Sequence, residues 1–180
     1  MIKINLGCGK RNFGKDWVHI DGGDHSHLDY KDIFNLPYKS NSVDLIYASH
    51  LIEYFDRTDV VNIIKEWKSK LKTGGILRIA VPDFGQMAFL YLKKGYPLES
   101  FLGPLYGKMK MSSETIYHKT SYDFKSLKSL LLSECGFLKV SPYDWRSTSH
   151  SSYDDHSQSY LPHMDKENGT IISLNVEAIK

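Results

Sequence analysis

The chain has 180 residues and a formal net charge near +2 with neutral histidines. That length supports one domain with a hydrophobic core, and the balanced charge predicts no nucleic-acid footprint. No apolar run is long enough to span a membrane, and because a strand is predicted at the start of the chain, we expect no signal peptide. Cys8 and Cys135 form no Cys-x-x-Cys motif, so we expect a reducing, cytoplasmic setting without disulfides or structural zinc.

The first motif is Asn5-Leu6-Gly7-Cys8-Gly9, which follows a short apolar run. The pattern predicts a buried strand, residues 2–6, that turns sharply at its carboxyl end. Gly7 can adopt backbone angles closed to other residues, and Gly9 leaves no side chain between the backbone and a ligand. Because open α/β sheets bind ligands outside the carboxyl ends of central strands, we expect a binding site at this turn.

A second strand is predicted at residues 17–20, and Asp21 stands at its tip. The link between the two strands, residues 10–16, is too short for the usual crossover helix, so we expect a loop or a single turn. An acidic side chain at this place suits a ribose, because its two oxygens can accept from both hydroxyls. The alternative is that Asp21 is only a turn residue before Gly22-Gly23.

The next elements continue the same alternation. A third strand is expected near residues 28–31, followed by a turn around Pro37. Residues 43–48 read as a buried strand, apolar on both faces except for Asp44. Ser49 and His50 come directly after it and should face the same crevice as the glycine turn.

The clearest helix pattern follows Asp56 and Thr58, either of which can cap it. Its buried face is defined by apolar residues at helical spacing, which are Val60, Ile64, Trp67 and Leu71. We expect this helix to end at Gly74-Gly75 and a strand to follow at residues 76–81. The order of strand, loop, strand, turn, strand, helix and strand predicts a parallel α/β sheet.

The second half is less regular. A helix is predicted at residues 84–94, stopped by Gly95, and another begins at a capping Asp123 and ends at Gly136. Residues 96–111 are expected to be irregular, either a lid packed on its own side chains or an acceptor-binding cover. Residues 112–122 are polar. Strands are expected at 137–140, with a continuation at 143–145, and at 170–179.

A polar stretch between the last two strands contains five residues that could coordinate or hydrogen-bond a ligand: His150, Asp154, Asp155, His156 and His163. Carboxylate and imidazole suit several divalent ions. Their spacing matches no ligand signature, so we predict no metal site and favour a surface loop. The same residues could instead hold the hydroxyls of a sugar-like acceptor, and the loop could fold back over the crevice.

Taken in order, the motifs resemble the class I S-adenosylmethionine-dependent methyltransferases. The matching segments are residues 5–9, Asp21, 32–38, 43–53, 71–75 and 78–83. The resemblance implies a single domain over residues 1–180 with a three-layer Rossmann-like α/β fold. The sheet would be mostly parallel, of the seven-stranded type, with an antiparallel C-terminal edge and some N-terminal helices reduced to loops.

The resemblance also implies the cofactor, S-adenosylmethionine, and its contacts. The loop containing Asn5, Gly7, Cys8 and Gly9 would approach the methionine part and the ribose, and Asp21 would hold the ribose hydroxyls. The cofactor's adenine amino group would donate to Asp32, and the backbone of Ile33 would meet the ring edge. Ser49, just past its strand, completes the expected cofactor set.

For the chemistry we expect two histidines in the acceptor site. In similar methyltransferases a histidine stands just before the helix that Asp123 caps here, and His118 occupies that place. We predict His118 as a general base or acceptor-orienting group and His50 as a residue lining the site, because imidazole titrates nearest neutrality.

The expected function is methyl transfer to a small polar acceptor, such as a saccharide or nucleotide sugar in glycan biosynthesis. The oligomeric state is left open. One alternative is a degenerate cofactor-binding module, because Asn5 replaces the acid usual in the family and two helices are missing. Another is a different Rossmann-like nucleotide-binding enzyme, although no Gly-x-Gly-x-x-Gly opens a helix here.

Overall fold

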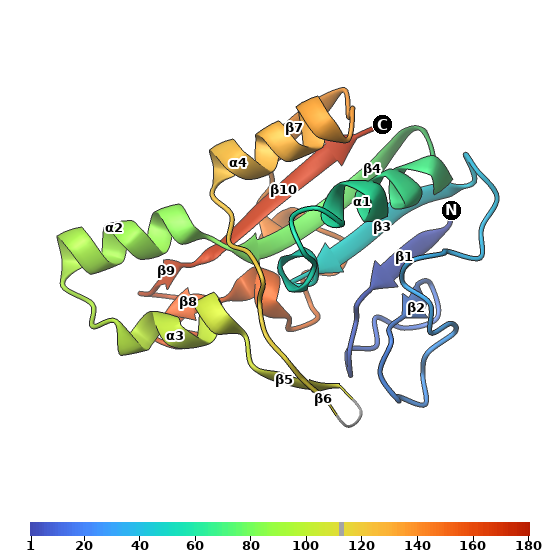
Figure 1. Ribbon diagram of the computed structural model, residues 1–180. Coiled ribbons are helices and arrows are strands. Elements are labelled where there is room, and N and C mark those ends of the chain that lie inside the picture. Colours follow the sequence, from blue (N-terminus) through green and yellow to red (C-terminus); the bar gives the residue numbers. More distant parts are fainter. Residues whose placement is uncertain (112–113) are drawn as a thin grey trace.

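The computed structural model describes residues 1–111 and 114–180. Its centre is a six-stranded sheet in the order β2-β1-β3-β4-β10-β7 (Figure 1). The strands are β1 (Lys3–Leu6), β2 (Val18–Ile20), β3 (Val43–Ser49), β4 (Leu71–Pro82), β7 (Lys139–Pro142) and β10 (Ser173–Ile179). The first four pair in parallel, whereas β10 runs antiparallel to both β4 and β7. This confirms the mostly parallel sheet with its antiparallel C-terminal part.

One strand expected from the sequence is missing from the sheet. Residues 28–31 contribute only an isolated bridge between Tyr30 and Ile20. The segment is short and polar, so it has little apolar surface to bury against the sheet. The Rossmann-like sheet therefore has six strands in place of the seven of the expected type.

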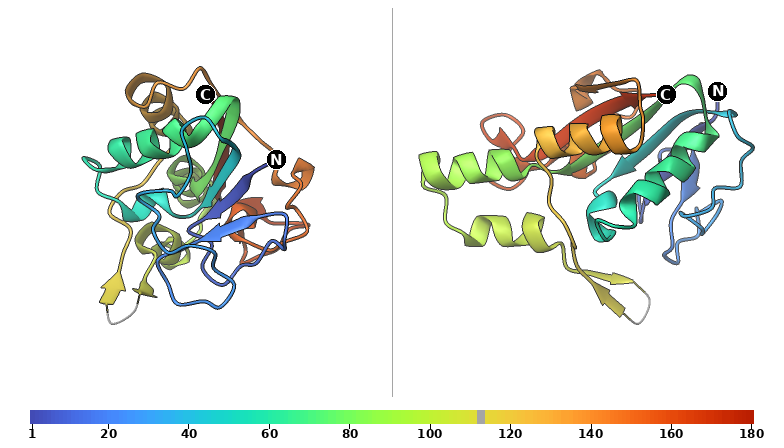
Figure 2. Two further views of the ribbon diagram at one scale, coloured as in Figure 1. Left: turned by 90° about the vertical axis from the view of Figure 1, so that its right-hand side faces the viewer. Right: turned by 45° about the horizontal axis from the view of Figure 1, so that its top comes forward.

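Helices cover one face of the sheet, as the two views in Figure 2 show. They are α1 (Val60–Lys70) and α4 (Phe124–Ser129), which continues into a π-helical turn, η2 (Leu130–Glu134). Side chains of a strand alternate between faces. Ile46 and Ala48 of β3 join the core cluster under these helices, whereas Leu45 and Tyr47 join a cluster on the opposite face.

The opposite face is covered by irregular chain. Between β7 and β10 run two 3-10 turns, η3 (Trp145–Ser147) and η4 (His156–Gln158). The rings of His150 and Tyr153 stack on Phe13, and the hydroxyl of Tyr47 donates to Asp155 over 2.6 Å. This C-terminal segment takes the place of a helical layer, which is how a chain with missing helices still buries both sheet faces.

The predicted end of α1 is wrong. The helix ends at Lys70, and β4 already begins at Leu71, which pairs with Val43. Gly74 and Gly75 lie within β4, where the pairing register with β3 shifts. Gly74 has a φ of +75° and its N–H donates to the Lys180 carbonyl, so the glycines form an irregularity of the strand rather than a helix cap.

Residues 96–111 are more regular than expected. After α2 (Phe84–Lys94), which ends at a left-handed Gly95 as predicted, the chain forms α3 (Glu99–Tyr106) and the short strand β5 (Met109–Met111). Phe101 of α3 packs with Met87 and Leu90 of α2, and this burial explains a helix that contains Pro104. Strand β5 pairs with β6 (Glu114–Ile116). In the predicted polar stretch 112–122, residues 112 and 113 lie outside the described residues.

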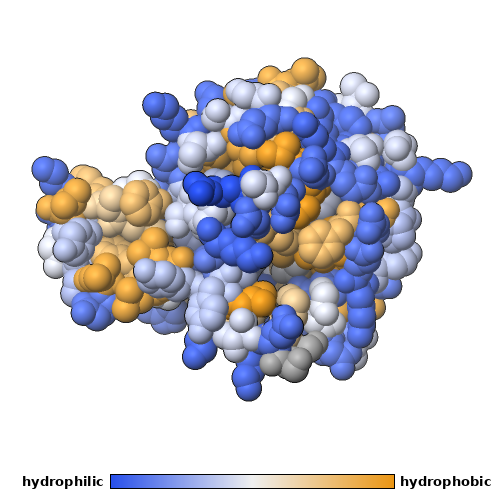
Figure 3. Space-filling view, viewed as in Figure 1, coloured by the Kyte–Doolittle hydropathy of each residue, from blue (hydrophilic) through white to orange (hydrophobic). Residues whose placement is uncertain are grey.

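Two further boundaries differ near the C-terminus. Trp145 opens η3, so the expected continuation of the strand at residues 143–145 is wrong. The expected strand 170–179 is divided at Ile172 into β9 (Thr170–Ile171), which pairs with β8 (Tyr160–Leu161), and β10. Figure 3 shows an orange, apolar area at its left, where α2 and α3 lie in Figure 1. The exposed apolar side chains on or next to these helices include Phe89, Leu92, Leu98 and Leu102. No helix of the described chain is long and apolar enough to cross a membrane.

Candidate active site

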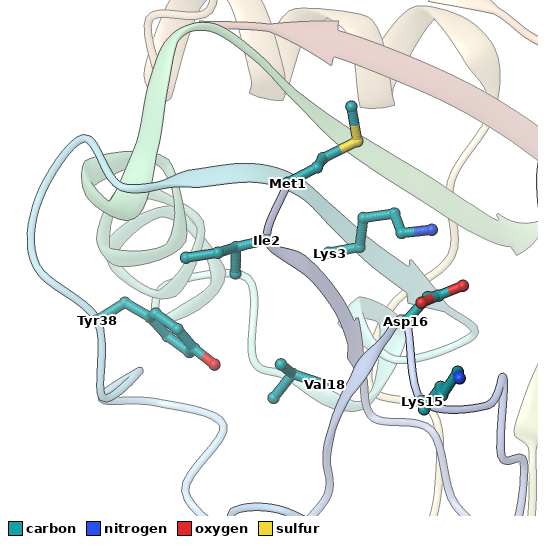
Figure 4. Close-up of a pocket in the computed structure, with 7 residues that line it drawn as sticks. All are labelled: Met1, Ile2, Lys3, Lys15, Asp16, Val18 and Tyr38. Carbon is teal, nitrogen blue, oxygen red and sulfur yellow. The ribbon is translucent and has the colours of Figure 1, made fainter.

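The main cavity, of about 1200 Å³, opens at the carboxyl ends of β1, β2 and β3. Its walls come from the glycine loop, the residues that follow β2 and β3, the α3–β5 segment and residues 154–164. A second cavity, of about 590 Å³, lies at the amino ends of β1 and β2 and is lined by Met1, Ile2, Lys3, Lys15, Asp16, Val18 and Tyr38 (Figure 4). Only the first lies where open α/β sheets place their ligands.

The glycine loop is shaped by two left-handed residues. Gly7 has a φ of +66°, and its N–H donates to the Ile20 carbonyl over 2.7 Å. A Cβ at this position would lie 2.7 Å from a methyl of Leu51. Gly9 has a φ of +54°, and a Cβ there would meet no atom within 4 Å. The positive φ of Gly7 and the nearby Leu51 side chain both favour glycine there, whereas Gly9 leaves open space toward the cavity.

Asp21 ties the glycine loop to the tip of β2. Its carboxylate accepts from the N–H of Gly9 over 2.8 Å and from the N–H of Gly23 over 2.7 Å. The side chain also lines the cavity. Because a carboxylate has about four acceptor positions, two remain for a ligand's hydroxyl groups. This placement suits the ribose role that the sequence predicts.

Ile33 and Ser49 also line the cavity, but Asp32 does not. The Ile33 carbonyl accepts from the indole N–H of Trp67 over 2.8 Å, which fixes this turn against α1. The Ser49 hydroxyl is buried and has no hydrogen-bond partner among the described residues. Asp32 is exposed and accepts from the backbone and side chain of Asn35, bonds that hold the pKa of its carboxyl below the usual value.

Asn5 and Cys8 lie behind the cavity wall. Asn5 is buried within β1, and its Nδ2 has no hydrogen-bond partner in the described part of the chain. Burial, together with the nearby Asp21 carboxylate, raises the pKa of the Cys8 thiol to about 12. Cys8 therefore stays a neutral thiol at pH 7. Asn5 and Cys8 both support the glycine loop from the side that faces away from the cavity.

A buried carboxyl that the sequence analysis did not single out for a role joins the two predicted histidines. Glu53 is 0 % exposed, and burial raises its pKa to about 8. One of its oxygens lies 3.5 Å from Nδ1 of His50 and 3.7 Å from Nε2 of His118. One feature of the sequence could have pointed to Glu53: it is an acidic residue between Ile52 and Tyr54, three positions after His50.

The ring nitrogens of His50 and His118 face protein groups. His118 Nδ1 lies 3.0 Å from the Pro104 carbonyl oxygen, so it carries the proton and donates to α3. His50 has a φ of +51°, and its Nε2 lies 3.3 Å from the Ser173 hydroxyl. Burial lowers the pKa of both imidazoles, so both are neutral at pH 7.

The polar stretch between β7 and β10 divides between the sheet and the cavity. His150 and Asp155 are buried against the sheet, and burial together with the cation of Arg78 lowers the pKa of His150 to about 4. Asp154, His156 and His163 line the cavity beside Asp155. Among the residues that the structure describes, no group of three or more His, Cys, Asp or Glu side chains is placed to hold a metal ion.

Residues 5–79 match the family model of a methyltransferase domain. Over 125 residues the chain is 28% identical to a demethylmenaquinone methyltransferase of Staphylococcus haemolyticus, covering 63% of this chain and 48% of that protein. The chain thus spans about half the length of the curated relative it matches. These matches support a relationship to the class I S-adenosylmethionine-dependent methyltransferases.

Solved structures of such methyltransferases have the same fold over 99% of this chain. One from Thermotoga maritima has a TM-score of 0.59 at 14% identity, with 82% of that chain covered. One from Archaeoglobus fulgidus has a TM-score of 0.58 at 14% identity, with 85% covered. The 1,6-didemethyltoxoflavin-N1-methyltransferase of Burkholderia thailandensis, solved with S-adenosylhomocysteine, has a TM-score of 0.55 at 10% identity, with 70% covered.

The cofactor of this class is S-adenosylmethionine, and the cavity has the features needed to hold it. The open space at Gly9, the free acceptor positions of Asp21 and the unpartnered Ser49 hydroxyl all lie at one end of the cavity. Among the described residues none accepts from the Ile33 backbone N–H, so this group is free for the edge of an adenine ring. The other end, around Tyr54, Tyr96 and residues 159–164, is left for an acceptor.

Proposed function

We propose that this domain transfers the methyl group of S-adenosylmethionine to a small acceptor held in the same cavity. The observation that carries the proposal is the joining of Gly9 and Asp21 by a 2.8 Å hydrogen bond at the carboxyl edge of the sheet. When bound, the cofactor supplies an activated methyl group on a sulfonium. The chain's task is then to align the acceptor with that methyl and exclude water.

The favoured acceptor is polar and anionic, such as a nucleotide sugar. Three cations line the cavity: Arg11, Lys108 and Lys110. Within the described residues none of the three has a carboxylate within 4 Å, and Arg11 Nε donates to the backbone carbonyl of Asp154. A diphosphate would give these cations partners. Such an acceptor would place the enzyme in glycan assembly.

A second acceptor class is favoured by different residues. Apolar side chains line part of the acceptor end: Tyr54, Tyr96, Leu161, Met164 and Ile172. They would suit an aromatic ring, and the similar protein of Staphylococcus haemolyticus is named for demethylmenaquinone. This second candidate is an aromatic hydroxyl compound of the naphthoquinol type.

We propose that His50 and His118 border the acceptor end and orient what binds there. Both lie within 4 Å of the Glu53 carboxyl, which links the end of β3 to the start of the segment that precedes α4. Replacing His118 by Ala would remove its bond to the Pro104 carbonyl and loosen α3 above the acceptor.

Cofactor binding is tested by calorimetry with S-adenosylmethionine, NAD and ATP. We expect binding of S-adenosylmethionine alone, and a loss of about 1–3 kcal/mol in Asp21→Ala, because charge-assisted hydrogen bonds to the ribose disappear. Asp24→Ala is the matched control, since Asp24 also borders the cavity but pairs with Lys31. Equal binding by a folded Asp21→Ala variant would contradict the ribose role, and tighter binding of NAD would favour another nucleotide-binding enzyme.

The acceptor is tested by formation of S-adenosylhomocysteine with UDP-glucose, free glucose and 1,4-naphthoquinol. We expect turnover with the nucleotide sugar, and a raised KM for it in Arg11→Gln. Turnover with the naphthoquinol alone would favour the second candidate. Binding of the cofactor with no turnover on a broad panel of glycans and quinols would support a non-catalytic module.

A further inference from the structure

His156 lines the cavity together with His50 and His118, but its surroundings differ from theirs. It lies in η4, its side chain is exposed, and it lines the cavity. Its ring centroid lies 5.1 Å from that of His50, which follows β3. His156 therefore stands at the carboxyl edge of the sheet, next to the residue that follows the central strand.

The backbone on both sides of His156 is fixed to the sheet. Before it, Asp155 is 2 % exposed and accepts from the Tyr47 hydroxyl over 2.6 Å and from the Ser157 N–H over 2.8 Å. After it, the Ser157 carbonyl accepts from the Asn175 side chain over 2.8 Å. These hydrogen bonds form a supporting shell that fixes the backbone on either side of the His156 side chain.

The ring nitrogens of the other two histidines lie close to buried protein groups. His118 faces the Pro104 carbonyl with one nitrogen and Glu53 with the other, and its side chain is 5% exposed. His50 faces Glu53 and the Ser173 hydroxyl. Among the described residues, no group lies against the ring nitrogens of His156 in this way. A base must reach the proton it removes, and His156 is free to do so.

We infer that His156 is the general base that accepts the proton of an acceptor hydroxyl. This inference rests on the proposed methyl transfer. As the acceptor oxygen forms its bond to the methyl carbon, the carbon–sulfur bond breaks and its electron pair stays on sulfur. The hydroxyl proton moves to a ring nitrogen of His156 and later leaves to water through the cavity mouth. His50 is a positioning residue that packs beside the base.

The protonation state fits this role. Partial desolvation at the cavity wall and the nearby cation of Arg11 lower the pKa of the His156 imidazole, so it is neutral at pH 7 and can accept a proton. The rate at saturation should rise through a midpoint below pH 6.5 and stay level at neutral pH. The titratable and charged groups that face His156 are Arg11, Asp154, Asp155, His50 and His118.

A first test needs no identified acceptor. The protein is saturated with S-adenosylhomocysteine, treated with diethyl pyrocarbonate at pH 7, and the acylated histidines are mapped by mass spectrometry. Neutral, accessible imidazoles react, so we expect His156 to be modified at least ten-fold faster than His50 and His118. Equal or faster modification of His118 would overturn the inference. Calorimetry of S-adenosylhomocysteine alone reports separately on the proposed function.

A second test compares His156→Gln with His27→Gln, which alters a half-buried histidine that does not line the cavity. With a hydroxyl acceptor that turns over, we expect kcat to fall about 10²–10⁴-fold in His156→Gln and to stay unchanged in His27→Gln. Affinity for S-adenosylhomocysteine should stay within two-fold in both. Full kcat in His156→Gln, or a loss confined to KM, would overturn the assignment as base.

Discussion

Glu53 is the residue whose environment departs furthest from that of a surface carboxyl. It is fully buried, neither side-chain oxygen has a hydrogen-bond partner within the described chain, and two imidazoles lie within 4 Å. A charged carboxylate there would be costly, and this is why the pKa rises to about 8. Glu53 is thus a neutral acid at pH 7, and one of its oxygens lies 3.7 Å from the unprotonated nitrogen of His118.

This state makes stability depend on pH in a defined direction. The folded chain keeps the Glu53 proton up to about pH 8, whereas the unfolded chain releases it near 4.5. The contribution of Glu53 to the free energy of unfolding is therefore largest below pH 4.5. This contribution is lost as the pH rises through 8. Between pH 6.5 and 8.5, above the range where the lowered histidines titrate, the free energy of unfolding should fall by about 2 kcal/mol.

Glu53→Gln should remove that dependence, because the amide does not titrate. Urea denaturation at intervals from pH 6.5 to 8.5 measures the effect. Glu134→Gln, which changes an exposed carboxyl at the end of η2, is the matched control and should keep the wild-type slope. A flat wild-type profile would mean that Glu53 is ionised in the folded protein.

At the scale of elements, the two glycines of the glycine loop, Gly7 and Gly9, have different structural roles. Both have positive φ, but a Cβ on Gly7 would press on Leu51, whereas a Cβ on Gly9 would enter open space that belongs to the cavity. We expect Gly9→Ala to cost about 1 kcal/mol of stability through its backbone angles and to reduce S-adenosylhomocysteine affinity at least ten-fold. Denaturation and calorimetry on the same samples give the two quantities.

Gly7→Ala is its natural partner variant. It has the same backbone penalty and adds a clash, so stability should fall by a further 1–3 kcal/mol or so. The two variants thus separate folding from binding within one five-residue motif. Wild-type affinity in Gly9→Ala would show that the cofactor does not approach the loop.

The sequence predicted the elements whose signals are local. The glycine turn, the buried strand before Ser49 and the end of α2 at Gly95 were all predicted from spacing and residue type. It misplaced the end of α1, because Leu71 fits the helical period and the strand equally well. It missed α3, since the packing of Phe101 on α2 decides that helix and a Pro argues against it.

The same limit applies to the candidate site. Gly7, Gly9 and Asp21 follow strands in sequence, so their meeting at one sheet edge could be predicted. Glu53 and His156 acquire their environments from chain that lies far away in sequence. Only the folded structure brings η4 beside the end of β3.

For the whole molecule, the C-terminal segment that covers the second face is tied to the sheet by the bond from Tyr47 to Asp155. Tyr47→Phe would leave a buried carboxylate short of a donor, and we expect a loss of about 1–3 kcal/mol. Backbone hydrogen exchange at residues 150–160 should accelerate as well. Tyr153→Phe keeps the ring that stacks on Phe13 and should change neither quantity. Unchanged exchange in Tyr47→Phe would mean that the aromatic stack alone holds the segment.

The position of β10 between β4 and β7 has a consequence for the chain while it is being made. Strand β4, of 12 residues, ends at Pro82, but its neighbour β10 begins only at Ser173. Within the sheet, β7 pairs with β10 alone. A nascent chain emerging from the ribosome therefore exposes one long apolar edge of β4 until almost all of the sequence has been translated. Such an edge invites pairing with other chains, so slow or interrupted translation should lead this protein to aggregation rather than to a stable fragment.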